Sequence, residues 1–129
     1  MTIKVYLVED NRTIRETLSE ALEELAPSQV VGFAEDEATA VEWLTANQGA
    51  CDLVIIDIFL KRGSGIGVLR AISNMRVHKI IASNYATDDM RRKCLDLGAN
   101  RVFDKSNEFE QLVEYCSRLD SGDTGFGDP

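Results

Sequence analysis

The chain of 129 residues has no long hydrophobic run, one histidine and three cysteines. A membrane-spanning helix needs about 20 consecutive apolar residues, and no run in the sequence approaches that length. The N-terminal stretch MTIKVYLVED turns acidic where a secretory signal would continue its apolar segment, so we expect no targeting peptide and no membrane partner. These absences favour a cytoplasmic protein.

The cysteines Cys51, Cys94 and Cys116 are odd in number and form no C-x-x-C pair. With His78 as the only histidine, neither a zinc site nor a disulfide framework is expected. The cysteines are interpreted as small buried or half-buried residues in a reducing compartment. No nucleophile pattern accompanies His78, so we do not expect it to act as a general base.

Acidic residues outnumber basic ones by 22 to 14, which gives a net charge of -8 and a pI of about 4.6. This balance argues against direct nucleic-acid binding by the domain. The length and the 44% hydrophobic content fit one domain, predicted over residues 1–119. Residues 120–129, DSGDTGFGDP, are polar and glycine-rich and are predicted to form a flexible tail or linker remnant.

Five short apolar runs alternate with five amphipathic stretches. The runs are mostly continuous and rich in β-branched residues: Ile3 to Val8, Val30 to Ala34, Leu53 to Ile56, Lys79 to Ala82 and Arg101 to Phe103. Continuous runs are typical of strands buried on both faces of a parallel sheet. Helical spacing of 3.6 residues marks the stretches between and after them: Ile14 to Leu25, Ala38 to Leu44, Val68 to Met75, Met90 to Leu97 and Phe109 to Cys116. The alternation predicts an α/β fold with helices on both faces of one parallel sheet.

Several helix ends carry capping residues. Asp36 is a predicted N-cap of the second helix, and Thr87 followed by two aspartates opens the fourth, which Gly98 closes. Asn107 with Glu110 three residues later resembles a capping box for the fifth helix.

Polar residues follow four of the five apolar runs. They are Glu9 and Asp10 after the first run, Asp57 after the third, Ser83 after the fourth, and Asp104 and Lys105 after the fifth. In a doubly wound sheet, binding and chemistry take place beyond the carboxyl ends of the strands. If these four strands are neighbours, the polar residues converge on one rim.

Three clustered carboxylates would repel one another and raise their own pKa values, and a hard divalent cation such as Mg²⁺ relieves that repulsion. With the cation bound, Asp57 can stay ionised and act as a nucleophile toward a phosphoryl group. Lys105 and the Ser83 hydroxyl would then neutralise charge on the phosphoryl oxygens. In this interpretation the apolar strand is a rigid mount for Asp57.

Resemblance to a known family rests on four segments: VYLVEDN, LVIIDIFL, IIASNY and LGANRVFDK. With their spacing, they resemble the receiver domain of bacterial two-component response regulators over residues 3 to about 119. The resemblance implies a flavodoxin-like (βα)5 fold with strand order 2-1-3-4-5. It also implies phosphorylation of Asp57 by a sensor histidine kinase or histidine phosphotransfer protein, with Mg²⁺ or Mn²⁺ as cofactor.

The resemblance assigns a role to each polar position. Asp57 matches the phosphoacceptor, Lys105 the lysine that pairs with the phosphoryl group, and Ser83 the switch hydroxyl that hydrogen-bonds to it. The metal ligands match Glu9, Asp10, Asp57 and the backbone carbonyl of Phe59.

The sequence departs from the family pattern near the switch. Val102 stands where an aromatic ring often swings inward on activation, and Tyr85 or Phe103 is a candidate substitute. Ser106 follows Lys105 in place of the usual proline, so the cis bond often found there is not expected.

The loop after Asp57 also departs from the pattern. It reads LKRGSGIG, and its glycines, Gly63, Gly65 and Gly67, fit neither P-loop nor dinucleotide spacing, so a flexible turn is predicted. The side chains of Phe59 and Tyr85 are candidates for shielding a phosphoryl group from water.

Phosphorylation adds roughly -1.5 to -2 charge units at one position. In the family, this biases the surface of the fourth helix, fifth strand and fifth helix between two arrangements. Arg91, Arg92 and Tyr115 are the candidate contacts there for a partner or a homodimer. The receiver is either a stand-alone domain or the first part of a regulator whose effector domain follows Pro129.

Three other functions fit parts of the pattern, since fold alone does not settle function. A small phosphohydrolase would also use an aspartyl nucleophile, although Phe59 occupies the place of its second acid. A flavin-binding electron carrier shares the topology, but the segment EDNRTIRE lacks a phosphate cradle. A receiver that binds partners without being phosphorylated is the third alternative.

Overall fold

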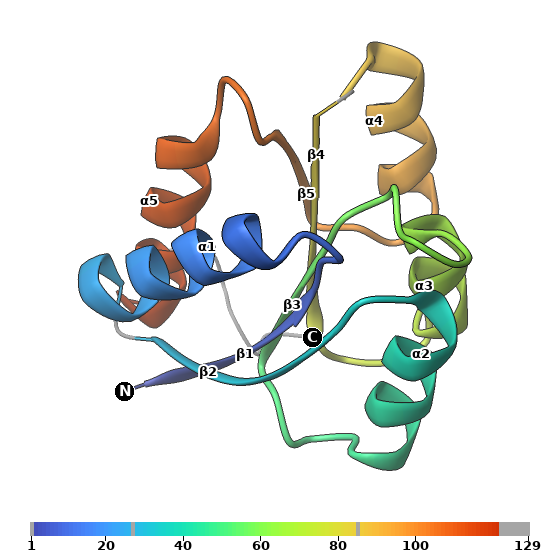
Figure 1. Ribbon diagram of the computed structural model, residues 1–129, viewed down its shortest axis with the longest axis horizontal. Coiled ribbons are helices and arrows are strands. Elements are labelled where there is room, and N and C mark those ends of the chain that lie inside the picture. The colour runs from blue at the N-terminus through green and yellow to red at the C-terminus, as the bar shows by residue number, and fades with distance from the viewer. Residues whose placement is uncertain (1, 27, 85, 122–129) are drawn as a thin grey trace.

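The computed structural model describes residues 2–26, 28–84 and 86–121, and within them five strands alternate with five helices (Figure 1). The strands are β1 (Ile3–Val8), β2 (Ser28–Ala34), β3 (Leu53–Ile56), β4 (His78–Ser83) and β5 (Arg101–Asp104). The helices are α1 (Arg12–Leu25), α2 (Glu37–Ala46), α3 (Gly65–Ala71), α4 (Asp88–Asp96) and α5 (Phe109–Ser121).

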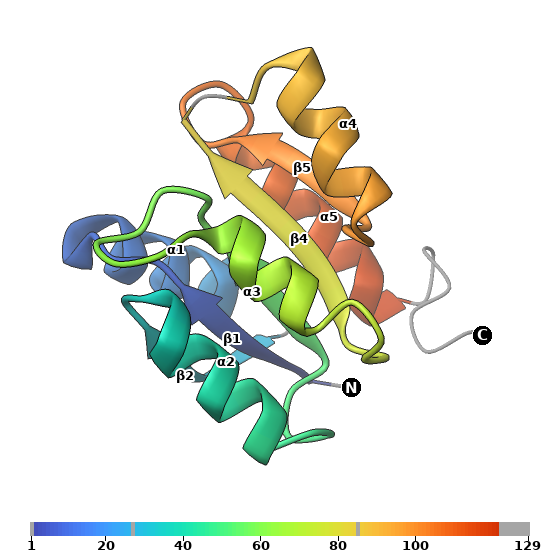
Figure 2. The same cartoon turned by 90° about the vertical axis from the view of Figure 1, so that its right-hand side faces the viewer.

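All the strand pairs are parallel, and the strand order is β2-β1-β3-β4-β5. Helices α1 and α5 cover one face of the sheet, and α2, α3 and α4 cover the other (Figures 1 and 2). The predicted flavodoxin-like (βα)5 architecture and its strand order 2-1-3-4-5 are therefore confirmed.

Each face of the sheet packs into its own apolar cluster. The four residues of β3 are all buried and alternate between the clusters, with Val54 and Ile56 on the α2-α3-α4 side and Leu53 and Ile55 on the other. Burying such a side chain stabilises the fold by about 1.5–3 kcal/mol. On the α2 side, Tyr6 of β1 stacks on Trp43, with ring centroids 4.2 Å apart.

Three of the predicted helix boundaries are confirmed. Asp36 caps α2 by accepting the Thr39 N–H at 2.8 Å, and this hydrogen bond lowers the pKa of Asp36. Thr87 caps α4 by accepting the Met90 N–H, and Gly98 follows α4 with a φ of 108°, in the left-handed region that favours glycine.

The capping box predicted for α5 is wrong. The helix begins at Phe109, and the Glu108 carbonyl accepts its first helical bond, from Leu112. Asn107 lies one residue too early because the Asp104 carboxylate accepts the N–H groups of Ser106 and Asn107, which forms a local turn and delays the helix.

Helix α3 is shorter than its apolar stripe predicted. It ends at Ala71, and Met75 lies in a turn where its N–H donates to the Ile72 carbonyl. Ser73 and Asn74 favour turns over helix because their side chains compete for backbone groups. Met75 still packs on the α2-α3-α4 core cluster.

All three cysteines are buried with free thiols, as predicted. None of the helices in the described ranges combines the length and apolar character needed to cross a bilayer. Helix α5 continues two residues past the predicted domain end at 119, and the rest of the predicted tail, residues 122–129, lies outside the described residues.

Candidate functional site

The site lies at the carboxyl edge of the sheet, where backbone bonds continue one residue beyond the strands. The Glu9 N–H donates to Ala34, the Asp57 N–H to Val8, and the Lys105 N–H to Ser83. Because these bonds fix the backbone, the side chains that follow β1, β3 and β5 are held at one edge. Glu9, Asp57 and Ser83 are buried there, with 4%, 6% and 0% of their surface exposed.

Lys105 reaches two of the carboxylates. Its Nζ atom lies 2.6 Å from Glu9 Oε1 and 3.3 Å from Asp57 Oδ2, and its side chain is 9% exposed. The ammonium group supplies a compensating positive charge to these buried carboxylates.

Glu9, Asp10 and Asp57 each offer a carboxylate oxygen, and these oxygens lie within 4.8 Å of one another. With Lys105 beside them, three negative charges and one positive charge leave a local charge of about -2. Oxygen ligands and this residual charge fit a hard divalent cation such as Mg²⁺. Phe59 is close to the cluster, because its N–H lies 3.3 Å from Asp57 Oδ1.

Burial raises the pKa of Asp57 from 3.8 to about 6. The Lys105 ammonium lowers this pKa, the charge of Glu9 raises it, and the Phe59 N–H lowers it. The burial effect is larger than the others, so the isolated protein holds Asp57 as a carboxylate that protonates more readily than an exposed one.

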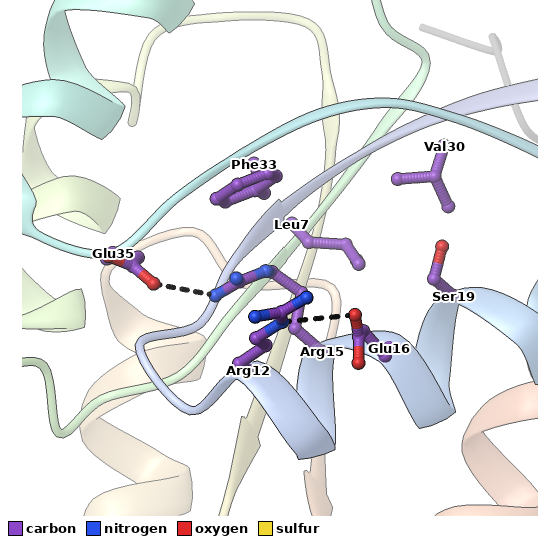
Figure 3. A pocket seen from close by; sticks show the side chains of 8 residues that line it. All are labelled: Leu7, Arg12, Arg15, Glu16, Ser19, Val30, Phe33 and Glu35. Carbon is purple, nitrogen blue, oxygen red and sulfur yellow. Dashed lines mark hydrogen bonds and ion pairs between the residues drawn. The ribbon is translucent and has the colours of Figure 1, made fainter.

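Arg15, in helix α1, supports the acidic loop that carries Glu9 and Asp10. The sequence alone did not reveal this role. Its Nη1 donates to the Glu9 carbonyl at 2.9 Å and to the Glu35 carboxylate at 3.1 Å, and its guanidinium lies 3.9 Å from the centre of the Phe33 ring (Figure 3). Arg15, Phe33 and Glu35 line an open pocket of about 540 Å³ between α1 and β2, and none of the candidate site residues lines it.

The predicted flexible turn after Asp57 is closely packed. Gly65 and Gly67 belong to α3, and only Gly63 has a positive φ, at 78°. A Cβ atom on Gly65 would overlap the backbone carbonyl of Asp57. Glycine therefore permits close packing of the loop against the site. From the sequence alone, the same glycines predicted a flexible turn.

The switch candidates are divided between the two faces of the sheet. Val102 is buried in the α2-α3-α4 cluster, whereas Phe103 is buried in the α1-α5 cluster, 5.8 Å from the Tyr115 ring. Phe103 thus lies on the opposite face from the position that Val102 occupies. Tyr85 lies outside the described residues.

The three candidates for the partner surface differ in their surroundings. Arg91 donates to the carbonyls of Ala86 and Val102 and to the Glu108 carboxylate, at 3.1, 2.9 and 2.8 Å. Arg92 is exposed. The Tyr115 hydroxyl lies 2.8 Å from His78 Nε2. Arg91 therefore joins α4 to β5 and to the start of α5.

The sequence matches the model of the response regulator receiver domain over residues 5–117. The chain belongs to the response regulator receiver domain family.

Among curated proteins, this receiver domain is 30% identical over 124 residues to protein-glutamate methylesterase/protein-glutamine glutaminase 1 of Chromobacterium violaceum, covering 92% of the chain and 34% of that protein. It is 31% identical over 106 residues to a protein with the same activity names, numbered 3, from Leptospira interrogans, covering 80% of the chain and 30% of that protein. The chain spans about a third of the length of these relatives, and the activities in their names belong to the longer proteins.

Solved structures of other proteins share the fold. The response regulator domain of Thermotoga maritima CheB superposes with a TM-score of 0.81 at 24% identity, covering 100% of both chains. The phosphorylated cyanobacterial phytochrome response regulator RcpA superposes with a TM-score of 0.77 at 26% identity, covering 95% of this chain and 94% of that one.

Proposed function

We propose that this receiver domain accepts a phosphoryl group on Asp57 from a sensor histidine kinase or a histidine phosphotransfer protein. One observation carries the proposal: Lys105 Nζ lies within 3.3 Å of carboxylate oxygens from both Glu9 and Asp57, at the buried carboxyl edge of the sheet. Family membership supports these partners and a cytoplasmic location.

In the transfer, one Oδ atom of Asp57 forms a bond to phosphorus while the P–N bond of the donor phosphohistidine breaks. The electron pair of the broken bond returns to the imidazole nitrogen. Lys105 keeps its proton and pairs with the phosphoryl oxygens, and the Ser83 hydroxyl donates to one of them.

Mg²⁺ or Mn²⁺ would be held by Glu9, Asp10, Asp57 and the Phe59 carbonyl. When bound, the cation neutralises charge on the carboxylates and the phosphoryl oxygens. Arg15 and the backbone bonds of Glu9 and Asp57 keep the carboxylates in place before the cation arrives.

The output surface is proposed to be α4, β5 and α5, with Arg92 and Tyr115 as contacts for a partner or a second copy. Arg91 connects the segment after Ser83 to the segment after Lys105 through Ala86 and Glu108. Charge reversal at Arg92 should weaken partner binding or dimerisation of the phosphorylated protein, measured by analytical ultracentrifugation.

The phosphorylation test is intact mass after incubation with acetyl phosphate and Mg²⁺. The wild type should gain one phosphoryl group, Asp57→Asn should gain none, and the exposed-site control Asp96→Asn should behave as wild type. A gain that survives in Asp57→Asn would exclude this residue as the acceptor. Continuous turnover of an added phosphate ester would instead favour the phosphohydrolase alternative.

A further inference from the structure

Glu37, the first residue of α2, reaches across to the β3–α3 loop, which comprises residues 57–64. Its Oε1 atom accepts the Ser64 N–H at 2.9 Å, and its own N–H donates to the Arg62 carbonyl at 3.1 Å. Helices α2 and α3 lie side by side in Figure 2 and are in contact. A carboxylate at the start of α2 thus holds a loop 27 residues further along the chain.

Two glycines leave space for this carboxylate. A Cβ atom on Gly63 would lie 2.5 Å from Glu37 Cβ, and a Cβ atom on Gly67 would overlap the Glu37 carboxylate. Glycine is a poor helix former, yet Gly67 lies inside α3. The space that the Glu37 side chain needs therefore explains glycine at both positions.

The loop that Glu37 holds is a small hairpin whose two sides are joined to each other. Phe59 and Ser64 form an antiparallel bridge, the Ser64 hydroxyl lies 3.4 Å from the Ile58 carbonyl, and the Gly65 N–H donates to that carbonyl at 2.8 Å. Restraining Ser64 therefore restrains Phe59 directly opposite.

We propose that Glu37 is a positioning residue that holds the Phe59 backbone carbonyl in the orientation needed to bind a divalent cation. It acts through Ser64 and the hairpin and does not contact the cation itself. The role rests on the proposed function, because it assumes that the Phe59 carbonyl is a ligand. It adds the start of α2 to a site whose reacting groups lie at the carboxyl ends of other strands.

The first test measures Mg²⁺ affinity of the full chain by isothermal titration calorimetry. Glu37→Ala should weaken binding by about 10-fold, the lower end of the losses typical for residues that orient metal ligands. Glu37→Gln keeps an acceptor for the Ser64 N–H and should stay near the wild-type affinity. Glu42→Ala, an exposed glutamate on the same helix, removes the same charge and should also stay near it.

A second readout needs no metal. Hydrogen exchange of the Ser64 amide should be faster in metal-free Glu37→Ala than in the wild type, and unchanged in Glu42→Ala. Circular dichroism verifies that each variant is folded at the temperature of the titration.

The third test is a double-mutant cycle. Gly67→Ala should weaken Mg²⁺ binding by displacing the carboxylate, whereas the same change added to Glu37→Ala should cause no further loss. Because alanine favours helix, Gly67→Ala should not unfold α3 once Glu37 is removed.

The outcomes separate the two proposals. Wild-type affinity in Glu37→Ala, or equal losses in Glu37→Ala and Glu42→Ala, would overturn the positioning role while leaving the proposed function intact. A wild-type protein that neither binds Mg²⁺ nor becomes phosphorylated would overturn the proposed function and this role with it.

Discussion

Lys105 Nζ lies closer to Glu9 Oε1, at 2.6 Å, than to Asp57 Oδ2, at 3.3 Å. The ammonium is thus shared between a proposed metal ligand and the proposed phosphoacceptor, with the shorter contact to the ligand. A divalent cation on Glu9 would compete for that contact and leave Lys105 available to the phosphoryl group.

Removing this ammonium should destabilise the metal-free protein. Lys105→Met leaves Glu9 and Asp57 buried without a cation, and breaking a buried ion pair in this way costs about 3–5 kcal/mol. Urea denaturation measures the loss. The control Lys61→Met removes a lysine that is 61% exposed and 3.7 Å from Glu35, and it should change stability by less than about 0.5 kcal/mol. A Lys105→Met protein as stable as the wild type would show that Glu9 and Asp57 have other compensation.

Ionisation of Asp57 should lower the stability of the metal-free protein. Its pKa is about 6 in the folded protein against 3.8 ordinarily, so the folded state binds more protons between these values and stability falls as pH rises through them. The free energy of unfolding of the metal-free protein is therefore lower above pH 6 than it would be with an ordinary Asp57 pKa. Asp57→Asn should therefore be more stable than the wild type at pH 7.5, with the advantage shrinking toward pH 4. Unfolding free energies at the two pH values measure this, and an advantage independent of pH would contradict it.

His78 should make the stability of the protein depend on pH in the opposite direction. Burial and the neighbouring Lys79 lower its pKa from 6.5 to about 4, so the unfolded state binds more protons between these values. Stability is then lost as pH falls from 6.5 to 4. His78→Gln should remove this dependence, measured by unfolding of both proteins at pH 4.5 and 7. An unchanged pH dependence would assign it to other groups.

Arg91 should matter more for stability than its neighbour Arg92. Arg91→Ala removes hydrogen bonds to Ala86, Val102 and Glu108. Because the ion pair with Glu108 is partly exposed to solvent, the free energy of unfolding should fall by only about 1–2 kcal/mol. Arg92→Ala is the matched control and should change stability by less than about 0.5 kcal/mol. Thermal unfolding distinguishes the two variants, and equal effects would contradict the tethering role of Arg91.

The sequence predicted most of the fold because the strands are short, mostly apolar runs that alternate with amphipathic helices. The proposed reacting groups could be named from the sequence as well, since each of them lies at or just beyond the carboxyl end of a strand. Pairing partners were harder to predict. Arg91 and Arg92 are adjacent in the sequence but about 100° apart around a helix, so one turns toward Glu108 and the other toward solvent.

The contacts of Glu35 and Glu37, which follow β2, were missed for a similar reason. Glu35 and Glu37 look like solvated acids, and no periodicity shows that one pairs with Arg15 and the other with Ser64. Three glycines after Asp57 were the available signal, because glycine also marks a place where another group approaches closely.

The stack of Trp43 on Tyr6 gives the protein a built-in optical reporter. Trp43 is the only tryptophan in the chain, and Tyr6 belongs to the strand that ends just before Glu9. Fluorescence emission from Trp43 therefore comes from a single environment. A displacement of the acidic loop that is passed along β1 would change this emission, so no attached label is needed to detect it.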